Sequence, residues 1–192
     1  NRALETAIAR GGRLFGANES RPGELNIPAI YGIGESLIYF IDRYGDNSIY
    51  DVDFNFIDDV DGQNPSGLLS IDHLTHNVGV GRLQEWHDFY AKIFNFRSVR
   101  YFDIKGDQTG LISKVMLSPD NQICIPINEP TDGKSQIQEY LDEYKGEGVQ
   151  HVAFTTSNII NSLDAIKGSN IDFLDVPNTY YEDLPGRPFT VR

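Results

Sequence analysis

A strand followed by a helix occurs twice in this chain, and that repeat constrains the fold more than any other feature. Residues 71–78 have the composition of a β-strand, and apolar residues three and four apart over 83–94 indicate an amphipathic helix. The same plan restarts with a strand at 149–155 and a helix at 159–166. Repetition of this kind indicates duplication of one structural unit.

Three further strands and a short helix are predicted between the two strand–helix pairs. The strands cover 96–104, 110–118 and 122–128, with turn sequences between them, and the helix covers 137–144. The repeating unit is therefore a strand, a helix and three strands, which is an α+β plan. The second copy contributes only its first strand and helix.

The chain before residue 71 is expected to belong to another domain. A helix opens it and ends at Gly11-Gly12, and a β-meander follows with strands at 24–30, 36–42 and 49–56. Residues 58–70 are rich in acidic residues, Gly, Pro and Ser, which is typical of a linker. We therefore expect three parts: the end of an N-terminal domain (1–57), a linker (58–70) and the start of a C-terminal domain (71–192).

The two ends of the sequence suggest an internal fragment. The chain opens on Asn1 rather than on Met, already within helical periodicity. The turn-rich run 180–192 leads to no closing strand or helix. We therefore expect the fold to be incomplete at both ends.

Composition excludes several classes of partner. The chain has 16 Lys and Arg against 28 Asp and Glu, a net charge of −12, which repels nucleic acid. Its apolar runs fall far short of the roughly 20 residues that span a bilayer, so we expect no membrane segment. Cys124 is the single cysteine and cannot form an internal disulfide, which favours the cytoplasm.

Two of the four histidines are candidate metal ligands. His73 and His151 occupy the same position in the first strand of each copy, so duplication would bring them together across a pseudo-twofold axis. His76 lies three residues from His73, on the opposite face of the strand. His87 is in the helix, where packing or a surface hydrogen bond explains it. The alternative for the pair is two hydrogen-bonded strand histidines without a metal.

Two polar residues in the strands are candidates for ligand binding. If the other faces of these strands rest on the helix, alternation points Ser113 and Asn128 into the concave side of the sheet. There they could orient a polar ligand, although a solvated rim would explain them as well. Cys124, between two isoleucines and without a basic neighbour, is expected to be a buried filler.

Several stretches together resemble one enzyme family. The stretches are LNIPAI (25–30), SIYDVDF (48–54), IDHLTHNV (71–78), YFDIKG (101–106), IPINEP (125–130), GEGVQHVA (146–153) and TYYE (179–182). In their order and spacing the chain resembles the 4-hydroxyphenylpyruvate dioxygenase family of the vicinal oxygen chelate superfamily, which is built from βαβββ modules. The resemblance covers essentially all residues.

The resemblance implies a site. His73 and His151 would be two ligands of a non-haem Fe(II), and the third would be a Glu that no residue here matches and that we expect beyond residue 192. It assigns no residue a direct catalytic role. The residues that it implies for substrate binding are Ser113, Pro126, Asn128, Gln136 and Gln150.

The resemblance also implies a reaction. Two imidazoles and a carboxylate leave three positions on iron, enough for a bidentate 2-oxo acid and O₂. The expected activity converts 4-hydroxyphenylpyruvate and O₂ to homogentisate and CO₂ in tyrosine catabolism. The alternatives are 4-hydroxymandelate synthase and a non-catalytic binding module of the same fold. We expect the fragment to be inactive for lack of the third ligand. Its open sheet edge should either form a homo-oligomer with another copy or leave the end of the chain poorly ordered.

Overall fold

The structure is a computed structural model that describes residues 2–16, 23–55, 65–105, 110–183 and 185. These residues form two compact units. Unit 1 comprises Asn1–Gln63 and Leu69–Thr155, and unit 2 comprises Asn64–Leu68 and Thr156–Arg192. We describe each unit by itself.

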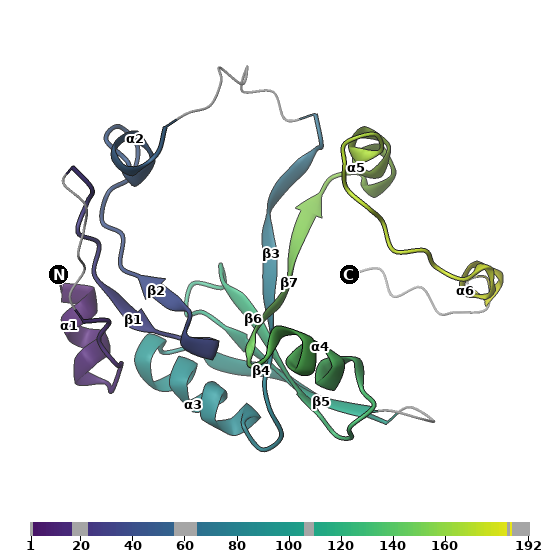
Figure 1. Cartoon of the computed structure of the whole chain (residues 1–192), viewed down its shortest axis with the longest axis horizontal. Helices are drawn as coiled ribbons and strands as arrows, with labels where there is room; N and C mark the ends of the chain where they lie inside the picture. The colour runs from purple at the N-terminus through teal and green to yellow at the C-terminus, as the bar shows by residue number, and fades with distance from the viewer. Residues whose placement is uncertain (1, 17–22, 56–64, 106–109, 184, 186–192) are drawn as a thin grey trace. The chain divides into compact units, whose positions relative to one another are not determined.

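A five-stranded sheet is the centre of unit 1 (Figure 1). Its strand order is β4-β5-β6-β3-β7. The strands are β3 (Leu68–Asn77), β4 (Arg97–Lys105), β5 (Gly110–Leu117), β6 (Cys124–Pro130) and β7 (Gly148–Thr156). Strands β4, β5 and β6 form an antiparallel meander, and β3 pairs in parallel with β6. The predicted strands 96–104, 110–118, 122–128 and 149–155 are confirmed, with ends that differ by up to two residues.

Strand β3 joins the two copies of the repeat. It begins at Leu68, three residues earlier than predicted, so residues 68–70 belong to the sheet. On its other side lies β7, and the hydroxyl oxygens of Ser70 and Thr155 are 2.7 Å apart. The side chains of His73 and His151 also meet across this pair, so the strands run in opposite directions. That relation is the one expected of two modules about a pseudo-twofold axis.

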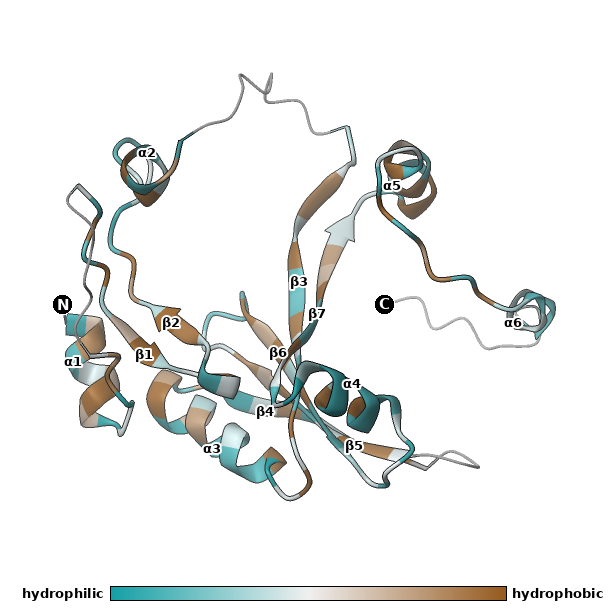
Figure 2. Cartoon of the chain, viewed as in Figure 1, coloured by the Kyte–Doolittle hydropathy of each residue, from teal (hydrophilic) through white to brown (hydrophobic). Residues whose placement is uncertain are grey.

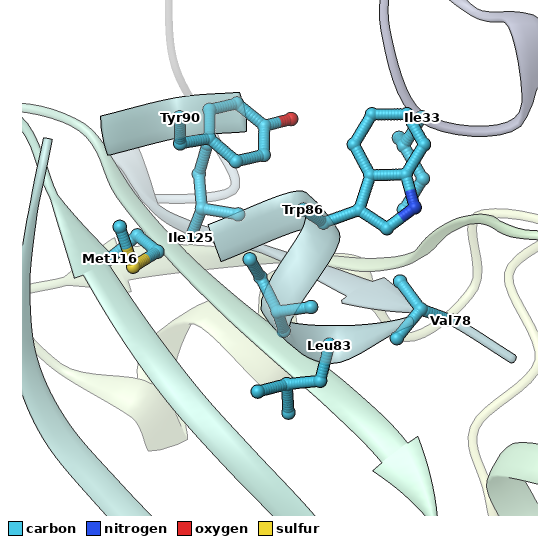
Figure 3. Packing of buried hydrophobic residues seen from close by; sticks show 8 residues of the cluster. Ile33, Val78, Leu83, Trp86, Tyr90, Met116 and Ile125 are labelled. Carbon is cyan, nitrogen blue, oxygen red and sulfur yellow. The ribbon is translucent and has the colours of Figure 1, made fainter. Parts of the chain in front are cut away.

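Helix α3 (Leu83–Phe94) covers one face of the sheet and has the bounds that its apolar stripe predicts. It ends where Asn95 adopts a left-handed conformation, with its N–H bonded to the carbonyl of Tyr90. Figure 3 shows the core that the helix makes with the strands. The buried members of this core are Ile33, Val78, Leu83, Trp86, Tyr90, Met116, Ile125 and Ile127.

The N-terminal part of unit 1 is less regular than predicted. Helix α1 (Arg2–Ala9) is confirmed, but the first two strands shorten to β1 (Ala29–Tyr31) and β2 (Leu37–Tyr39). A single 3₁₀ turn, η1 (Ile33–Glu35), lies between them.

The strand predicted at 49–56 is wrong, because Ile49–Asp53 is helix α2. Ser48 and Asp51 form a capping box, in which the Ser48 N–H donates to the Asp51 carboxylate at 2.7 Å. The apolar, β-branched composition of this segment favoured a strand, whereas the capping box that begins at Ser48 favours a helix. Residues 56–64, which include the last predicted residue of this strand and residues 58–64 of the predicted linker, lie outside the described residues.

Helix α4 (Gln136–Tyr144) precedes β7. The side chain of Ser135 caps it by accepting from the Gln138 N–H at 3.2 Å. The helix confirms the one predicted at 137–144, and most of its surface is polar (Figure 2).

Unit 2 contains the two remaining helices. Helix α5 (Ile159–Ile166) is mainly apolar (Figure 2) and confirms the predicted helix, with Asn158 as its cap. Helix α6 (Asn178–Asp183) corrects the expectation that the chain after residue 180 forms only turns. In the part of the chain that the structure describes, no helix has the length and apolar character needed to cross a bilayer.

Candidate metal centre

The structure brings His73 and His151 together. They lie on the neighbouring strands β3 and β7, and their Nε2 atoms are 3.3 Å apart. The ring centroids are separated by 5.4 Å, and the ring planes cross at 74°. Two residues 78 positions apart in the sequence therefore aim the same ring atom at a shared point.

The partners of the other ring nitrogens determine what the Nε2 atoms can do. The Nδ1 atom of His73 lies 2.6 Å from the carboxylate of Asp72, and Nδ1 of His151 contacts the amide oxygen of Gln150. Both partners are acceptors, so each Nδ1 carries the proton. In the neutral rings both Nε2 atoms then present lone pairs to each other. Such a pair is repulsive unless a cation or a proton lies between them.

The spacing of the two nitrogens fits a metal ion. With metal–nitrogen bonds of about 2.1 Å and an angle of about 100° at the metal, two adjacent ligands would be about 3.2 Å apart. The observed 3.3 Å is close to this value. The described residues hold no group of three His, Cys, Asp or Glu side chains that could bind a metal, so the pair accounts for two ligands. The donor set of two imidazoles thus suits Fe(II) or another first-row metal.

Thr75 lies on the same face of β3 as His73, and the sequence did not predict it as a site residue. Its hydroxyl lies 3.0 Å from Nε2 of His151, and the residue is only 2% exposed. Burial lowers the pKa of His151, and the neighbouring His73 lowers it further. Alternation from His73 would have placed Thr75 on this face, but a threonine in a strand is too common to single out.

A cavity of about 380 Å³ opens beside His151. Its polar lining includes three of the predicted substrate-binding residues: Asn128 from β6, Gln136 from α4 and Gln150 from β7. Gln150 and its neighbour His151 both line the cavity, although alternation along β7 would separate them. Their side chains also contact each other, through Nδ1 of His151 and the amide oxygen of Gln150. The remaining lining residues are Asn77, Ile104, Gly110, Leu111, Ser135 and Ile137.

Ser113 and Pro126 lie near this cavity rather than in its wall. Ser113 is paired directly with Asn128 across β5 and β6, and it is 5% exposed. Pro126 is two residues before Asn128 and shares its face. The other face of these strands carries Met116, Ile125 and Ile127 to the core under α3. The face predicted for Ser113 and Asn128 is therefore the one that they occupy.

The other two histidines are outside the centre. His76 is buried on the core side, where its Nε2 lies 2.6 Å from the hydroxyl of Tyr90. Burial lowers the pKa of His76 to about 4, and among the described residues its Nδ1 is buried without a hydrogen-bond partner. His87 is on the surface of α3 and contacts Gln84 and Asp88. Both positions agree with the sequence-based interpretation.

Cys124 is less buried than the filler that the sequence predicts. It lies at the start of β6 and is partly buried. Burial raises the pKa of its thiol, and the nearby carboxylate of Asp72 raises it further. A thiol held in its protonated form is a poor nucleophile.

Two family models match the sequence. The hydroxyphenylpyruvate dioxygenase N-terminal model matches residues 1–55, and the glyoxalase/bleomycin resistance protein/dioxygenase superfamily model matches residues 70–184. The chain belongs to that superfamily. The predicted α+β class with βαβββ modules and the resemblance to 4-hydroxyphenylpyruvate dioxygenase are both confirmed.

Two individual relatives show how similar the chain is to curated proteins. The chain is 50% identical over 188 residues to Hemolysin VllY of Vibrio vulnificus, an alignment that covers 96% of this chain and 52% of that protein. It is 48% identical over 188 residues to 4-hydroxyphenylpyruvate dioxygenase of Pseudomonas aeruginosa, with 97% and 52% covered. The chain thus spans about half the length of the curated relatives it matches.

A solved structure shares the fold. A triple mutant of 4-hydroxymandelate synthase from Streptomyces coelicolor superposes with a TM-score of 0.77 over 95% of this chain and 54% of that one. The sequence identity is 20%, so this likeness concerns the fold alone.

Proposed function

We propose that the whole protein is an Fe(II)-dependent dioxygenase that converts 4-hydroxyphenylpyruvate and O₂ to homogentisate and CO₂. The observation that carries the proposal is the pair of Nε2 atoms 3.3 Å apart beside a cavity with carboxamide side chains in its wall. Relatives named 4-hydroxyphenylpyruvate dioxygenase, at 43% to 52% identity, support the choice of substrate.

The metal would be held by His73 and His151, with a Glu beyond residue 192 as the third ligand. When bound, Fe(II) supplies open positions for the 2-oxo acid and for O₂ and carries the redox chemistry. The described residues around the two histidines keep both Nε2 atoms available to bind the metal. Asp72 and Gln150 accept from the two Nδ1 atoms, which leaves the lone pairs on Nε2.

The substrate would be bound by the polar residues of the cavity and its surroundings. Asn128, Gln136 and Gln150 offer both donors and acceptors, which suits a phenolic hydroxyl. Ser113 and Pro126 would hold the β5–β6 side of this wall through the pairing of the two strands. A volume of about 380 Å³ lies within the range of small-molecule sites.

Three further proposals concern the domains, the compartment and the oligomeric state. We propose domains at 1–57 and 71–192 with a linker at 58–70, of which residues 68–70 already belong to β3, and the cytoplasm as the compartment, where Cys124 and Fe(II) stay reduced. We also propose that the 192-residue chain forms a homo-oligomer. Strand β7 is the last strand of the described sheet, and its side chains Val152 and Phe154 are 40% and 51% exposed, so a second copy of the chain would cover this end of the sheet.

The alternative product, 4-hydroxymandelate, is supported by likeness of fold alone. A non-catalytic binding module would bind the ligand without consuming O₂. Product analysis separates the two enzymes, and O₂ consumption separates both from the binding module.

The test is carried out on the whole protein supplied with Fe(II). We expect wild type to consume O₂ with 4-hydroxyphenylpyruvate, and His73→Ala and His151→Ala to lose both turnover and stoichiometric iron. His87→Ala is the matched control, because His87 lies on the surface of α3 away from the centre. Retention of tight iron binding by both ligand variants would overturn the metal assignment. The 192-residue chain, which has two of the three ligands, should bind iron weakly and show no turnover.

A further inference from the structure

Asn77 is a buried polar residue in the cavity wall to which the resemblance assigns no role. It lies at the end of β3, on the same face as His73 and Thr75, and is only 2% exposed. Its neighbours His76 and Val78 turn to the opposite side, into the core. A carboxamide placed so deeply costs free energy unless it is hydrogen-bonded.

The backbone holds Asn77 directly beside Asn128. The two residues are paired in the parallel ladder of β3 and β6, and the Val78 N–H donates to the carbonyl of Asn128 at 2.9 Å. Their side chains meet as well, because Nδ2 of Asn128 donates to Oδ1 of Asn77 at 3.4 Å. Asn77 is thus the acceptor that engages one end of the Asn128 carboxamide.

That contact decides which group Asn128 offers to a ligand. A carboxamide has its nitrogen and oxygen on opposite sides, so a nitrogen held toward β3 turns the oxygen away from β3. Asn128 lines the cavity, and its Oδ1 is then the atom presented there. An oxygen in that position accepts a hydrogen bond from a ring hydroxyl and forms no hydrogen bond with a ring that lacks one.

We propose that Asn77 is a positioning residue, which fixes the carboxamide of Asn128 so that the site selects a ring carrying a hydroxyl donor. This inference rests on the proposed function for the ligand. The discrimination is asymmetric, because a ring without the hydroxyl leaves the oriented oxygen without a partner from the ligand. Loss of Asn77 lets the Asn128 amide rotate and removes the preference without removing the cavity.

The experiment measures binding by the whole protein with Fe(II) under argon. Calorimetry gives the ratio of the dissociation constants of phenylpyruvate and 4-hydroxyphenylpyruvate for wild type, Asn77→Ala, Asn128→Ala and the double variant. We expect the ratio to fall about tenfold in each single variant, the size of one hydrogen bond, and no further in the double variant. Asn77→Asp keeps an acceptor beside Asn128 and should restore most of the preference.

Two controls separate positioning from a merely structural role. Ile127→Val removes one methylene on the core face beside Asn128 and should leave the ratio unchanged while lowering the melting temperature. Without any ligand, the ¹⁵N signal of the Asn128 side-chain amide, assigned through Asn128→Asp, should shift in Asn77→Ala and remain near wild type in Ile127→Val. Because this measurement needs no ligand, it still tests the contact between Asn77 and Asn128 when a variant binds too weakly for calorimetry.

The outcomes distinguish the two proposals. If wild type prefers 4-hydroxyphenylpyruvate but the two single effects add in the double variant, Asn77 acts independently of Asn128 and the positioning role is overturned. If wild type shows no preference for the hydroxylated ligand, the proposed substrate fails, and with it the selection argued here. An unchanged amide signal in Asn77→Ala overturns the contact itself.

Discussion

Replacement of Glu147 by Ala should destabilise the chain more than any other change of a single charged residue described above. The Glu147 carboxylate is 15% exposed and accepts four hydrogen bonds. They come from the Gly79 N–H at 3.0 Å, from Nε and Nη2 of Arg82 at 2.9 and 3.1 Å, and from the Trp86 indole at 2.7 Å. Glu147 lies directly before β7, the first strand of the second copy, and thereby ties the start of that strand to helix α3 of the first copy.

The expected cost follows from what each donor can do afterwards. The side chain of Arg82 is 43% exposed and can return to water, whereas Trp86 is 9% exposed and its N–H would be left without an acceptor. With the Gly79 N–H also unpaired, the loss should be about 3 kcal/mol in the free energy of unfolding. Glu147→Gln, whose amide can accept fewer bonds and adds donors facing donors, should lose about half of that.

Urea unfolding followed by circular dichroism measures the effect. Glu85→Ala is the matched control, because Glu85 is the other carboxylate paired with Arg82 but is 56% exposed, and its loss should cost less than about 1 kcal/mol. Equal losses in Glu147→Ala and Glu85→Ala would refute the reasoning.

The same network predicts a pH dependence. Burial alone would raise the pKa of Glu147, but the bonds from Arg82, Gly79 and Trp86 outweigh it and lower the pKa. The stabilisation is therefore complete above the unfolded value of about 4.3 and is lost as pH falls through the lowered folded value.

Two further predictions concern packing and burial. Gly34→Ala should lower the free energy of unfolding, measured by thermal unfolding, by about 3 kcal/mol or more, because φ is +57° and a Cβ would lie 1.8 Å from the backbone oxygen of Glu147. Gly45→Ala is the control: its φ is +67° but no atom lies close, so it should lower the free energy by only about 1 kcal/mol. Similar losses for the two variants would count against the close contact. Because burial lowers the pKa of His76 from 6.5 to about 4, the unfolded chain takes up a proton between these values and stability should fall by about 3 kcal/mol from neutral pH to pH 4. His76→Phe should flatten that slope and Tyr90→Phe should keep it, whereas an unchanged slope in His76→Phe would show that another group titrates.

The sequence predicted the elements whose pattern is long and regular. Helix α3 has its apolar residues on one stripe from Leu83 to Phe94, so both its existence and its bounds followed from that stripe. The strands of the meander were also predictable, because turn sequences separate them and their faces alternate. Helix α2, by contrast, has only five residues of mixed preference, and its capping box outweighs its β-branched composition.

The site was predictable only in part. Equivalent positions in a repeat were enough to pair His73 with His151, because duplication relates distant residues without any knowledge of the path between them. Asn77 and Thr75 gave no signal of their own, since their importance depends on which residues of β6 and β7 lie beside them. Register between strands far apart in the sequence is not encoded in local composition.

The position of β3 also sets an order for folding. Its partners are β6 and β7, and the contacts that join them span 51 residues at Asn77 and Asn128 and 78 residues at His73 and His151. The β4-β5-β6 meander closes through short turns and can form early, whereas the insertion of β3 requires large loops to close first. The two histidines therefore meet only after the sheet is assembled. We expect metal uptake to report the last step of folding rather than to nucleate the first, so that iron added early in refolding would not speed the formation of the sheet.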